Sequence, residues 1–510
     1  MNHALILPIL LPLVTGASQL LLYRLPFGVQ RLVGVASTLG LVLLGVWGLA
    51  MAGSGEYQLY HAGDWPAPFG IVLVLDRLSA IMLALTAVLG FCCLLYASSG
   101  SSTDKRGAHF HALFQFQLAG LNGAFLTGDL FNLFVFFEIL LIASYALLLH
   151  GGGRARSRAG LHYVVINLAG SALFLIALGT LYGLTGTLNM ADLALRVAEA
   201  PPEDAPLLAA ASLILLVVFG IKAAILPLLF WLPRAYSASS APVAALFAIM
   251  TKVGVYAILR VFLLVFALGE TPVNATAWLW LWPLALLTLA LGGVGVLGSN
   301  SLRTLTAYLV ILSVGTLLAT ISFVTPAALG AALFYLIHST GMTAVFFLLA
   351  DLLGRQREEG YDRFSAIGPI GHRWLLGTLF FVAAIAMAGL PPFSGFVSKA
   401  WILQASSQEP QGLWLWGVLL TAALLTLIAL SRTGSNWFWR PAAMAKPYPL
   451  ERGPLALVVS TMVGLNGLLA VFGEPVMGYL ELTAEQLLDP QAYIAAVLPQ
   501  AIASAQEIAP

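Results

Sequence analysis

The chain has 510 residues, of which 60% are hydrophobic and only 9% carry a charge, and its mean hydropathy is +0.94. This composition lies far outside the range of soluble globular domains and predicts a polytopic membrane protein. The formal net charge is +1, so the total charge gives no reason to expect a nucleic-acid partner.

About fourteen apolar segments follow one another along the chain. Each is bounded by Gly, Pro, Arg or acidic residues and is long enough, at about 20 residues, to cross a bilayer as a helix. Backbone polar groups must be bonded internally in lipid, and the segments lack strand-like alternation, so an all-α bundle is favoured over a β-barrel. The predicted helices lie near residues 4–22, 30–52, 71–97, 111–127, 130–150, 161–186, 206–231, 241–267, 274–298, 302–324, 327–353, 372–405, 412–431 and 454–478.

Basic residues gather in alternate connections between these segments. Cytoplasmic loops carry an excess of Lys and Arg, so the alternation predicts an even number of helices with both termini outside. The outside loops then keep Arg196, with Arg77 at a helix mouth, and an acidic tail follows residue 479. The inside loops carry Arg24, Arg31, Lys105, Arg106, Arg154, Arg156, Arg158, Arg234, Arg303, Arg355, Arg357, Arg363, Arg373, Arg432, Arg440, Lys446 and Arg452.

Four charged residues fall inside the predicted spans. Three of the five lysines do so, Lys222, Lys252 and Lys399, and Glu138 is embedded in a run of Phe, Ile and Leu. A charge at the bilayer centre costs roughly 2.5 to 3.5 kcal/mol even on the mildest scale, so such residues mark ion paths by default. The alternative is that single lysines extend to the headgroups, which is least easy for Lys222. Arg260, by contrast, is expected to extend to the headgroups.

Two of the predicted helices are interrupted by proline and glycine. The first runs through Gly220 to Pro227, and the second contains Pro391, Pro392 and Gly395. Proline removes a backbone donor and clashes with the preceding turn, so each helix should break near mid-membrane, with a lysine close to the break. Simple packing kinks are the alternative. The two are the seventh and twelfth helices, and because this offset is odd, the second copy should run through the membrane upside down, as in inverted-repeat transporters.

The buried charges suggest a switch. Glu138 and Lys222 lie near the middle of their helices and could pair, and because loss of one partner strands the other charge, their protonation states would be coupled. Burial disfavours the ammonium form of all three lysines, which makes proton exchange possible. His338 can exchange a proton near neutral pH and would bridge the two halves, although a hydrogen-bonded core histidine is nearly as good an interpretation.

Other kinds of site find little support in the sequence. Cys92 and Cys93 are adjacent in an apolar run, and His109 and His111 lack a third ligand at useful spacing, so we expect no metal site. No phosphate loop, dinucleotide fingerprint or nucleophile elbow occurs, so neither a cofactor nor covalent catalysis is expected.

Several stretches resemble one known family. They are Leu126-Thr127-Gly128-Asp129-Leu130-Phe131-Asn132-Leu133-Phe134-Val135-Phe136-Phe137-Glu138-Ile139-Leu140, Gly220-Ile221-Lys222-Ala223, Ser237-Ala238-Ser239-Ser240-Ala241-Pro242-Val243-Ala244-Ala245 before Lys252, and Gly389-Leu390-Pro391-Pro392-Phe393-Ser394-Gly395-Phe396 before Lys399. This set is similar to the proton-channel subunits shared by respiratory complex I and the multisubunit Mrp-type cation/proton antiporters. The resemblance covers about residues 70 to 435 and is strongest to the D subunits of the Mrp type.

The resemblance implies a fourteen-helix fold with two inverted five-helix repeats, each holding one broken helix. The repeats would be residues 111–267 and 268–432, preceded by three helices in 1–110 and followed by a last helix and the tail in 433–510. It also implies roles along a proton path. Glu138 would pair with Lys222 as the input switch, Lys252 would be the central relay, His338 would hand the proton on, and Lys399 would face the opposite half-channel.

One departure from the family pattern stands out. Relatives often carry a further lysine about a turn after the histidine, whereas this chain has Gly341-Met342-Thr343. The tenth helix offers Ser313 as a polar group there, so water or a neighbouring subunit must bridge more of the path.

The expected function is that of a proton-translocating subunit in a multisubunit antiporter that exchanges Na⁺ or K⁺ for protons across a bacterial inner membrane. Its partners would be other antiporter subunits, and the chain would be a transporter subunit and no enzyme. Three alternatives remain open on the sequence: a membrane-arm subunit of a complex I-like or hydrogenase-type redox complex, a stand-alone solute porter, and a non-conducting scaffold.

Overall fold

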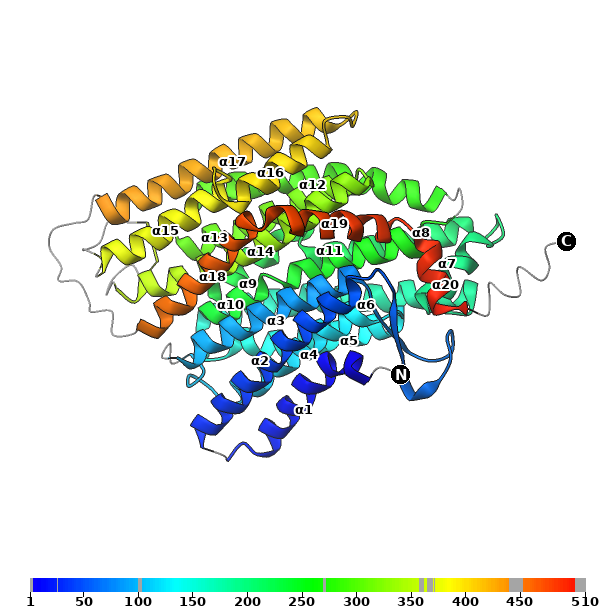
Figure 1. Cartoon of the computed structure of the whole chain (residues 1–510), viewed down its shortest axis with the longest axis horizontal. Coiled ribbons are helices and arrows are strands. Elements are labelled where there is room, and N and C mark those ends of the chain that lie inside the picture. The colour runs from blue at the N-terminus through cyan, green and yellow to red at the C-terminus, as the bar shows by residue number, and fades with distance from the viewer. Residues whose placement is uncertain are drawn as a thin grey trace.

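The computed structural model describes residues 3–24, 26–99, 103–268, 272–356, 362–364, 370, 372–439 and 453–499, with only the backbone described for 272–275. Four of the basic residues assigned to inside loops, Arg357, Arg440, Lys446 and Arg452, lie outside the described residues. Figure 1 shows a bundle of helices that lie side by side along the long axis of the molecule.

From α1 to α11, the first half of the described chain contains ten helices in addition to the short α7. They are α1 (Leu7–Leu21), α2 (Phe27–Ala52), α3 (Arg77–Ser98), α4 (Phe110–Leu126), α5 (Leu130–Leu149), α6 (Arg154–Thr185), α8 (Ala205–Ala223), α9 (Trp231–Ala238), α10 (Ala241–Phe247) and α11 (Met250–Arg260). The second half contains α12 (Pro272–Gly298), α13 (Leu302–Ile321), α14 (Pro326–Gly354), α15 (Arg373–Ala388), α16 (Ser394–Ala405), α17 (Gly412–Gly434) and α18 (Gly453–Val471).

The prediction of an all-α membrane bundle is confirmed. Twelve helical stretches among the described residues are long and apolar enough to cross a membrane. The remaining two predicted segments are helical as well: α4 has 17 residues and carries several polar side chains, and the segment 372–405 is divided into α15 and α16. Each of the fourteen predicted segments therefore holds helix.

The core of the bundle is formed by a few helices that are covered by the others. In the most apolar part of Ala241–Val265, which contains α10 and α11, 100% of the residues are buried. The corresponding shares of buried residues in α13 and α14 are 89% and 94%. In contrast, α2, α17 and α18 are only 28% to 33% buried. Their outward faces carry large apolar side chains such as Leu43, Leu424 and Leu457, as a lipid-facing surface requires. Lys252, Ser313 and His338 are thus carried by the three most enclosed segments.

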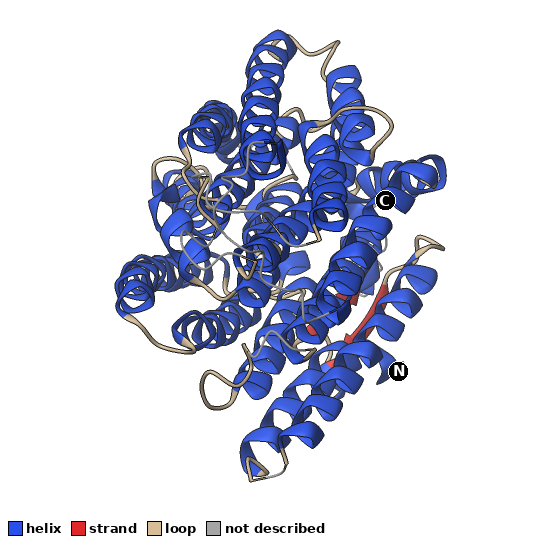
Figure 2. Cartoon of the chain, turned by 90° about the vertical axis from the view of Figure 1, so that its left-hand side faces the viewer, coloured by secondary structure: helices blue, strands red, loops and turns tan. Residues whose placement is uncertain are grey.

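One end of the molecule is closed by short elements, and we call it the α20 end. It holds a two-stranded antiparallel hairpin, β1 (Gln58–His61) and β2 (Val72–Leu75), in which Tyr60 pairs with Leu73; the strands are red in Figure 2. The helices α7 (Met190–Ala198) and α20 (Pro490–Val497) pack together there, and α19 (Gly473–Leu487) leads into α20 along the first half of α14.

The predicted helix at 71–97 begins later than expected. Residues 72–75 are the strand β2, and the helix starts at Arg77 because the Asp76 carboxylate caps it by accepting a hydrogen bond from the backbone N–H of Ser79 at 2.9 Å. Apolar run length alone does not separate a buried strand from the helix that follows it.

Candidate functional site

The ammonium group of Lys222 lies in the last turn of α8 and is buried. Its Nζ donates a hydrogen bond to the side-chain oxygen of Asn167 on α6, at 3.2 Å. The Asn167 amide nitrogen in turn donates to the backbone oxygen of Tyr163 at 2.9 Å, which fixes the orientation of the amide. A neutral amide from a neighbouring helix thus satisfies the buried lysine.

Glu138 on α5 is hydrogen-bonded to the same helix, α6, one turn after Asn167. Its carboxylate accepts a hydrogen bond from the Ser171 hydroxyl, and Ser171 lies four residues after Asn167 on α6. Within the described residues, Glu138 and Lys222 make no ion pair within 4.0 Å. The expected contact pair is therefore wrong in its geometry. The helix α6 packs against both α5 and α8, so its polar side chains lie between the two charges.

The first broken helix is interrupted between Ala223 and Leu228. Ala224 adopts a left-handed conformation (φ 63°), and the backbone N–H of Ile225 bonds back to the Gly220 oxygen at 3.0 Å. The freed N–H of Leu226 is satisfied by the Thr288 hydroxyl of α12 at 2.9 Å. Pro227 lies within this break, as predicted from the sequence. The interruption exposes the carbonyl end of α8 in the bundle interior, and the cation of Lys222 lies beside it.

The second broken helix closes in the same way. Gly389 adopts φ 86°, and the backbone N–H of Leu390 bonds back to the Ile385 oxygen at 3.1 Å. Pro391 and Pro392 lie in the break. The buried Lys399 on α16 folds back onto the end of α15, where its Nζ donates to the backbone oxygen of Ala388 at 2.6 Å. A cation at the carbonyl end of a helix is favoured by the helix dipole.

Gly395 lies inside the first turn of α16 and not in the break itself, which corrects the expectation. A side-chain carbon at this position would clash with the Ala386 backbone oxygen and lie 2.9 Å from Nε2 of His338. The glycine therefore allows α16 to approach both α15 and the histidine.

Lys252 lies at the centre of the bundle and has 0% of its surface exposed. Its Nζ donates to the Ser313 hydroxyl on α13 at 2.7 Å, and Ser313 donates to its own helix at Val310. The lysine on α11 is thus bonded to a helix of the second half of the chain. A small cavity with about 10 Å³ of space links Lys222 and Asn167 to Met250 and Val253 of α11. Such a volume holds about one water molecule.

His338 on α14 is fully buried and contacts the second broken helix. Its Nδ1 lies 2.9 Å from the Ser394 hydroxyl at the start of α16, and its Nε2 has no hydrogen-bond partner among the described groups. The Tyr335 ring, one turn earlier, lies 6.3 Å from the histidine ring, and its hydroxyl is paired with Thr316 of α13. Thr316 follows Ser313 by three residues, so hydroxyl groups lie between Lys252 and His338.

The structure therefore buries Lys222, Lys252, His338 and Lys399, half-buries Glu138, and adds neutral polar groups between them. Asn167 and Ser171 lie between Glu138 and Lys222, and Thr316, Tyr335 and Ser394 lie around the route to His338. Asn167 and Ser171 are four residues apart in a largely apolar segment, and this spacing could have predicted two polar side chains on one face of the helix. The hydroxyl groups carried no such signal because Ser and Thr commonly bond their own helix.

A model of the family described as "NADH:quinone oxidoreductase/Mrp antiporter, TM" matches residues 127–426. The chain belongs to this family. It is 42% identical over 543 aligned residues to the D subunit of a probable K⁺/H⁺ antiporter from Rhizobium meliloti, with 99% of each chain covered. It is also 38% identical to the D subunit of a Na⁺/H⁺ antiporter from Alkalihalophilus pseudofirmus, covering 98% of this chain and 100% of the relative.

Solved structures of the family share the fold. A chain of the Mrp complex from Dietzia superposes with a TM-score of 0.87 at 26% identity, covering 98% of this chain and 100% of that one. A chain of respiratory complex I from Thermus thermophilus superposes with a TM-score of 0.77 at 26% identity, covering 95% and 99%. The membrane-bound sulfane sulfur reductase, an archaeal respiratory membrane complex, gives a TM-score of 0.89 at 25% identity, covering 98% and 100%.

Arg260 differs from its predicted behaviour. We expected it to extend to the headgroups, but only 4% of its surface is exposed and it forms an ion pair with Asp76 at the start of α3, with Nη1 2.7 Å from Oδ2. The two residues are 184 positions apart, so no local pattern indicated the partner.

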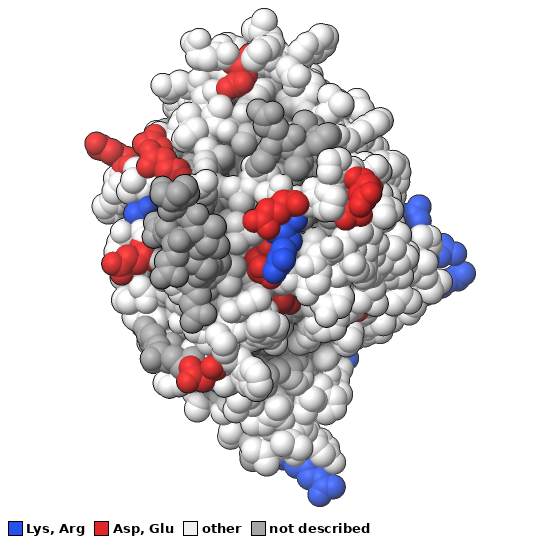
Figure 3. Space-filling model, turned by 90° about the vertical axis from the view of Figure 1, so that its right-hand side faces the viewer, with Lys and Arg blue, Asp and Glu red and all other residues white. Residues whose placement is uncertain are grey.

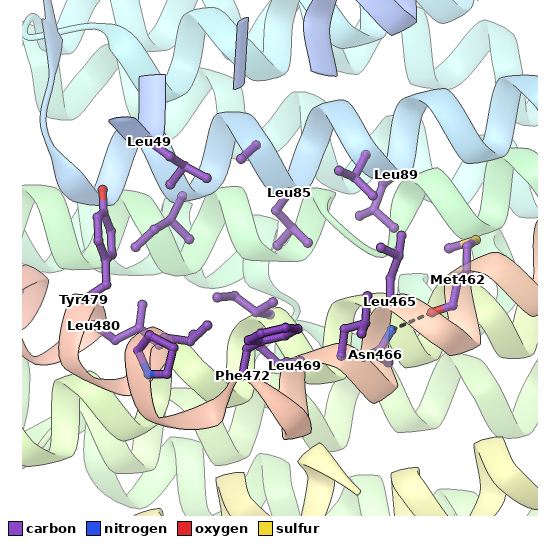
Figure 4. A pocket seen from close by; sticks show the side chains of 18 of the residues that line it. Leu49, Leu85, Leu89, Met462, Leu465, Asn466, Leu469, Phe472, Tyr479 and Leu480 are labelled. Atoms are coloured by element: carbon purple, nitrogen blue, oxygen red, sulfur yellow. Dashed lines mark hydrogen bonds between the residues drawn. The ribbon is translucent and has the colours of Figure 1, made fainter. Parts of the chain in front are cut away.

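A large apolar pocket of about 680 Å³ lies between α2, α3, α14, α18 and α19 (Figure 4). In it, the side-chain amide of Asn466 donates to the backbone oxygen of Met462 at 3.2 Å. Glu138, Lys222, Lys252, His338 and Lys399 do not line this pocket.

Proposed function

We propose that this chain is the proton-translocating D-type subunit of a multisubunit Mrp-type antiporter, which exchanges Na⁺ or K⁺ for protons. The observation that carries this proposal is the series of ionisable groups that runs from the half-buried Glu138 through Lys222, Lys252 and His338 to the buried Lys399, with amide and hydroxyl groups between them. The relatives named as antiporter D subunits match the chain over its whole length and support the same function.

The switch begins at Glu138. When this carboxylate takes up a proton, the negative charge near Lys222 is lost and the ammonium form becomes less favourable. Two unit charges 4 Å apart at an effective dielectric constant of about 20 interact by about 4 kcal/mol, so this more distant pair is coupled by less. The coupling energy is therefore of the same order as the roughly 2.3 kcal/mol that 100 mV of membrane potential supplies per charge. Coupling through Asn167 and Ser171 thus suits a switch that must reverse.

The proton then passes to the second half of the chain. From Lys222, which lines the small cavity, the proton passes to α11 beside Met250 and Val253 and reaches Lys252, which is bonded to Ser313. The hydroxyl groups of Thr316 and Tyr335 lead on towards His338. From His338 the route continues past Ser394 to Lys399 beside the second break. Each step changes the charge next to the following group, so movement in one half biases the other.

We infer that residues 111–267 and 268–432 are two inverted repeats, flanked by the three helices of 1–110 and by the region 433–510. The matching closure of the two breaks supports this division, because in each one an N–H bonds back across five residues after a left-handed residue. The breaks are five crossings apart, so their helices run in opposite directions.

The chain belongs in a bacterial inner membrane, with the α20 end and both termini outside. Two features support this orientation. The α20 end carries mostly acidic side chains, as Figure 3 shows for this face, among them Glu199 and Glu203. Basic residues such as Arg31, Arg303 and Arg355 are paired at the opposite end, with Asp104 and Asp351. Excess positive charge marks the inner side.

A membrane-arm subunit of a redox-driven proton pump is the second candidate, and the superposition on the archaeal respiratory complex favours it. Its local proton chemistry would be the same. The higher identity to antiporter subunits places the antiporter first, and copurification of flavin or iron–sulfur proteins would reverse that order.

The proposal is tested in everted membrane vesicles that contain the complete complex. Glu138→Ala and Lys222→Ala should each abolish the pH change induced by Na⁺ or K⁺, while Glu203→Ala at the exposed end should not. Immunoblots of the membranes must show that each variant inserts. Normal exchange in either of the first two variants would reject the scheme.

A further inference from the structure

The helix α11 carries three polar side chains on one face. Lys252, Tyr256 and Arg260 are spaced by four residues and therefore lie above one another along the helix. All three are buried, and the row leads from the centre of the bundle to the α20 end. The proposed proton route uses Lys252 but gives no role to the other two.

Arg260 ends this row in an ion pair that is saturated with hydrogen bonds. Its Nη1 and Nη2 lie 2.7 Å and 2.9 Å from the two carboxylate oxygens of Asp76. The backbone N–H and the hydroxyl of Ser79 also donate to Asp76, at 2.9 Å and 2.8 Å. A buried pair of this kind holds firmly while both charges are present, and loss of one charge strands the other.

Tyr256 lies between Lys252 and the pair, and both bonding directions of its hydroxyl are taken. It donates to the backbone oxygen of Phe125 at 2.7 Å and accepts from Nε of Arg260 at 3.3 Å. A guanidinium presents only N–H donors and cannot accept a proton. In this arrangement, no proton can pass between Lys252 and the Asp76 carboxylate, because Arg260 interrupts the row.

The C-terminal helix covers the pair directly. The Tyr493 ring of α20 lies 5.5 Å from the Arg260 guanidinium carbon and packs edge-on against Tyr57 at 5.5 Å. Its hydroxyl is buried and, within the described part of the chain, has no hydrogen-bond partner. The ring therefore holds Arg260 in place by packing, and its hydroxyl contributes no bond that would fix α20 permanently.

We propose that the Asp76–Arg260 pair is a proton gate between Lys252 and the α20 end of the molecule, and that Tyr493 holds it shut. This inference rests on the proposed function. When Arg260 moves away from Tyr256, the hydroxyl oxygen accepts a proton from the Lys252 ammonium while the tyrosine's own proton passes to Asp76. One N–H bond breaks at Lys252, one O–H bond forms at Asp76, and Tyr256 is neutral before and after. The protonated Asp76 no longer attracts Arg260 until it releases the proton to water.

The gate is tested by the passive proton leak of the complete complex in proteoliposomes. An imposed pH difference is followed with an internal dye in choline medium, without Na⁺ or K⁺. Tyr493→Ala removes the ring and should speed the decay about tenfold, which corresponds to about 1.4 kcal/mol in the barrier. Asp76→Asn removes the carboxylate that accepts the proton, so the double variant Asp76→Asn/Tyr493→Ala should decay as slowly as the wild type. Tyr493→Phe, which keeps the ring, and Asp192→Asn, which breaks the ion pair with the exposed Arg196, should decay like the wild type.

The other end of the route is tested by combining Tyr493→Ala with Lys252→Leu, which should also restore the slow decay. A normal decay in Tyr493→Ala, or a leak that persists after either Asp76→Asn or Lys252→Leu is added to it, would overturn the gate. Where the variant with Asp76→Asn fails to assemble, Tyr493→Ala with and without Lys252→Leu decides. Cation-driven exchange is measured in the same vesicles: a wild type without exchange rejects the proposed function, whereas normal exchange with a tight Tyr493→Ala variant rejects the gate alone.

Discussion

The Lys222 ammonium lies 3.2 Å from the side-chain oxygen of Asn167 and is not in contact with the carboxylate of Glu138. A neutral acceptor satisfies the buried cation without binding it as firmly as a carboxylate would. The charge of Glu138 acts from further away, through a helix that carries Ser171 and Asn167. This arrangement allows Lys222 to gain and lose a proton within one transport cycle.

Asn167→Asp should slow exchange because it places a carboxylate directly against the ammonium and stabilises the proton on Lys222. Net hydrogen bonds to charged groups are worth about 1.5 to 3 kcal/mol, so the rate should fall by about tenfold or more. The measurement is cation-induced pH change in everted vesicles at matched expression. Asn300→Asp, at an exposed position just before α13, is the matched control and should exchange normally. Unchanged exchange in Asn167→Asp would contradict the role given to the amide.

Ser313→Ala should impair transport by removing the one hydrogen bond that joins Lys252 to α13. An unsatisfied buried donor costs about 1 to 3 kcal/mol, and more when it is charged, so Lys252 should hold its proton less well. We expect a several-fold lower exchange rate in the same vesicle assay. Ser322→Ala removes a hydroxyl that bonds only its own helix, at Leu318, and serves as the control. Equal rates in the two variants would show that the contact with Lys252 is dispensable.

Gly389→Ala should destabilise the second broken helix. The residue has φ 86°, which costs an L-residue about 1 to 2 kcal/mol, and an added side-chain carbon would lie 2.6 Å from Cδ of Lys399. The lysine must then leave the end of α15. We expect a lower thermal midpoint in detergent together with loss of exchange. Gly417→Ala, at a helical position with no neighbour within 4 Å, should preserve both. A Gly389→Ala variant as stable and active as the wild type would refute this account of the break.

Acid should weaken the attachment of α2 through Asp104, which lies in the loop before α4. Burial by itself would raise the pKa of Asp104, but hydrogen bonds from His111 and Arg31 and the charge of Arg31 outweigh it and lower the pKa. A lowered pKa contributes stability that is present above the unfolded value of about 3.9 and is lost as the pH falls through the folded value. The stability difference between wild type and Asp104→Asn, measured by thermal unfolding in detergent, should be constant from pH 7 to about pH 5, begin to decline near pH 4 and be lost only at lower pH, where Asp104 becomes protonated in the folded protein. A difference already lost at pH 6 would assign the effect to another group.

The sequence was sufficient to locate the helices and the charges within them. Run length and flanking residues predicted every crossing segment, because lipid permits few other structures, and the prolines predicted both breaks. The sequence did not predict which helices pack against each other. The partner of Arg260 is Asp76, 184 residues away, and a period along one helix says nothing about the residue that faces it.

The same limit explains the missing direct pair at Glu138. Similar depth in the membrane made contact with Lys222 plausible, but the intervening α6 could not be inferred from depth alone. The start of α3 failed for a local reason: Val72 to Leu75 are as apolar as the helix that follows, and only the cap by Asp76 marks the boundary.

The central claim is that protons cross the molecule through Lys252, and one comparison tests it most directly. Lys252→Leu and the exposed Lys105→Leu are introduced separately into the complete complex, and the Na⁺- or K⁺-induced pH change is measured in everted vesicles with equal amounts of assembled protein. We predict that Lys252→Leu abolishes the response and that Lys105→Leu leaves it intact. A normal response in the assembled Lys252→Leu complex would contradict the account.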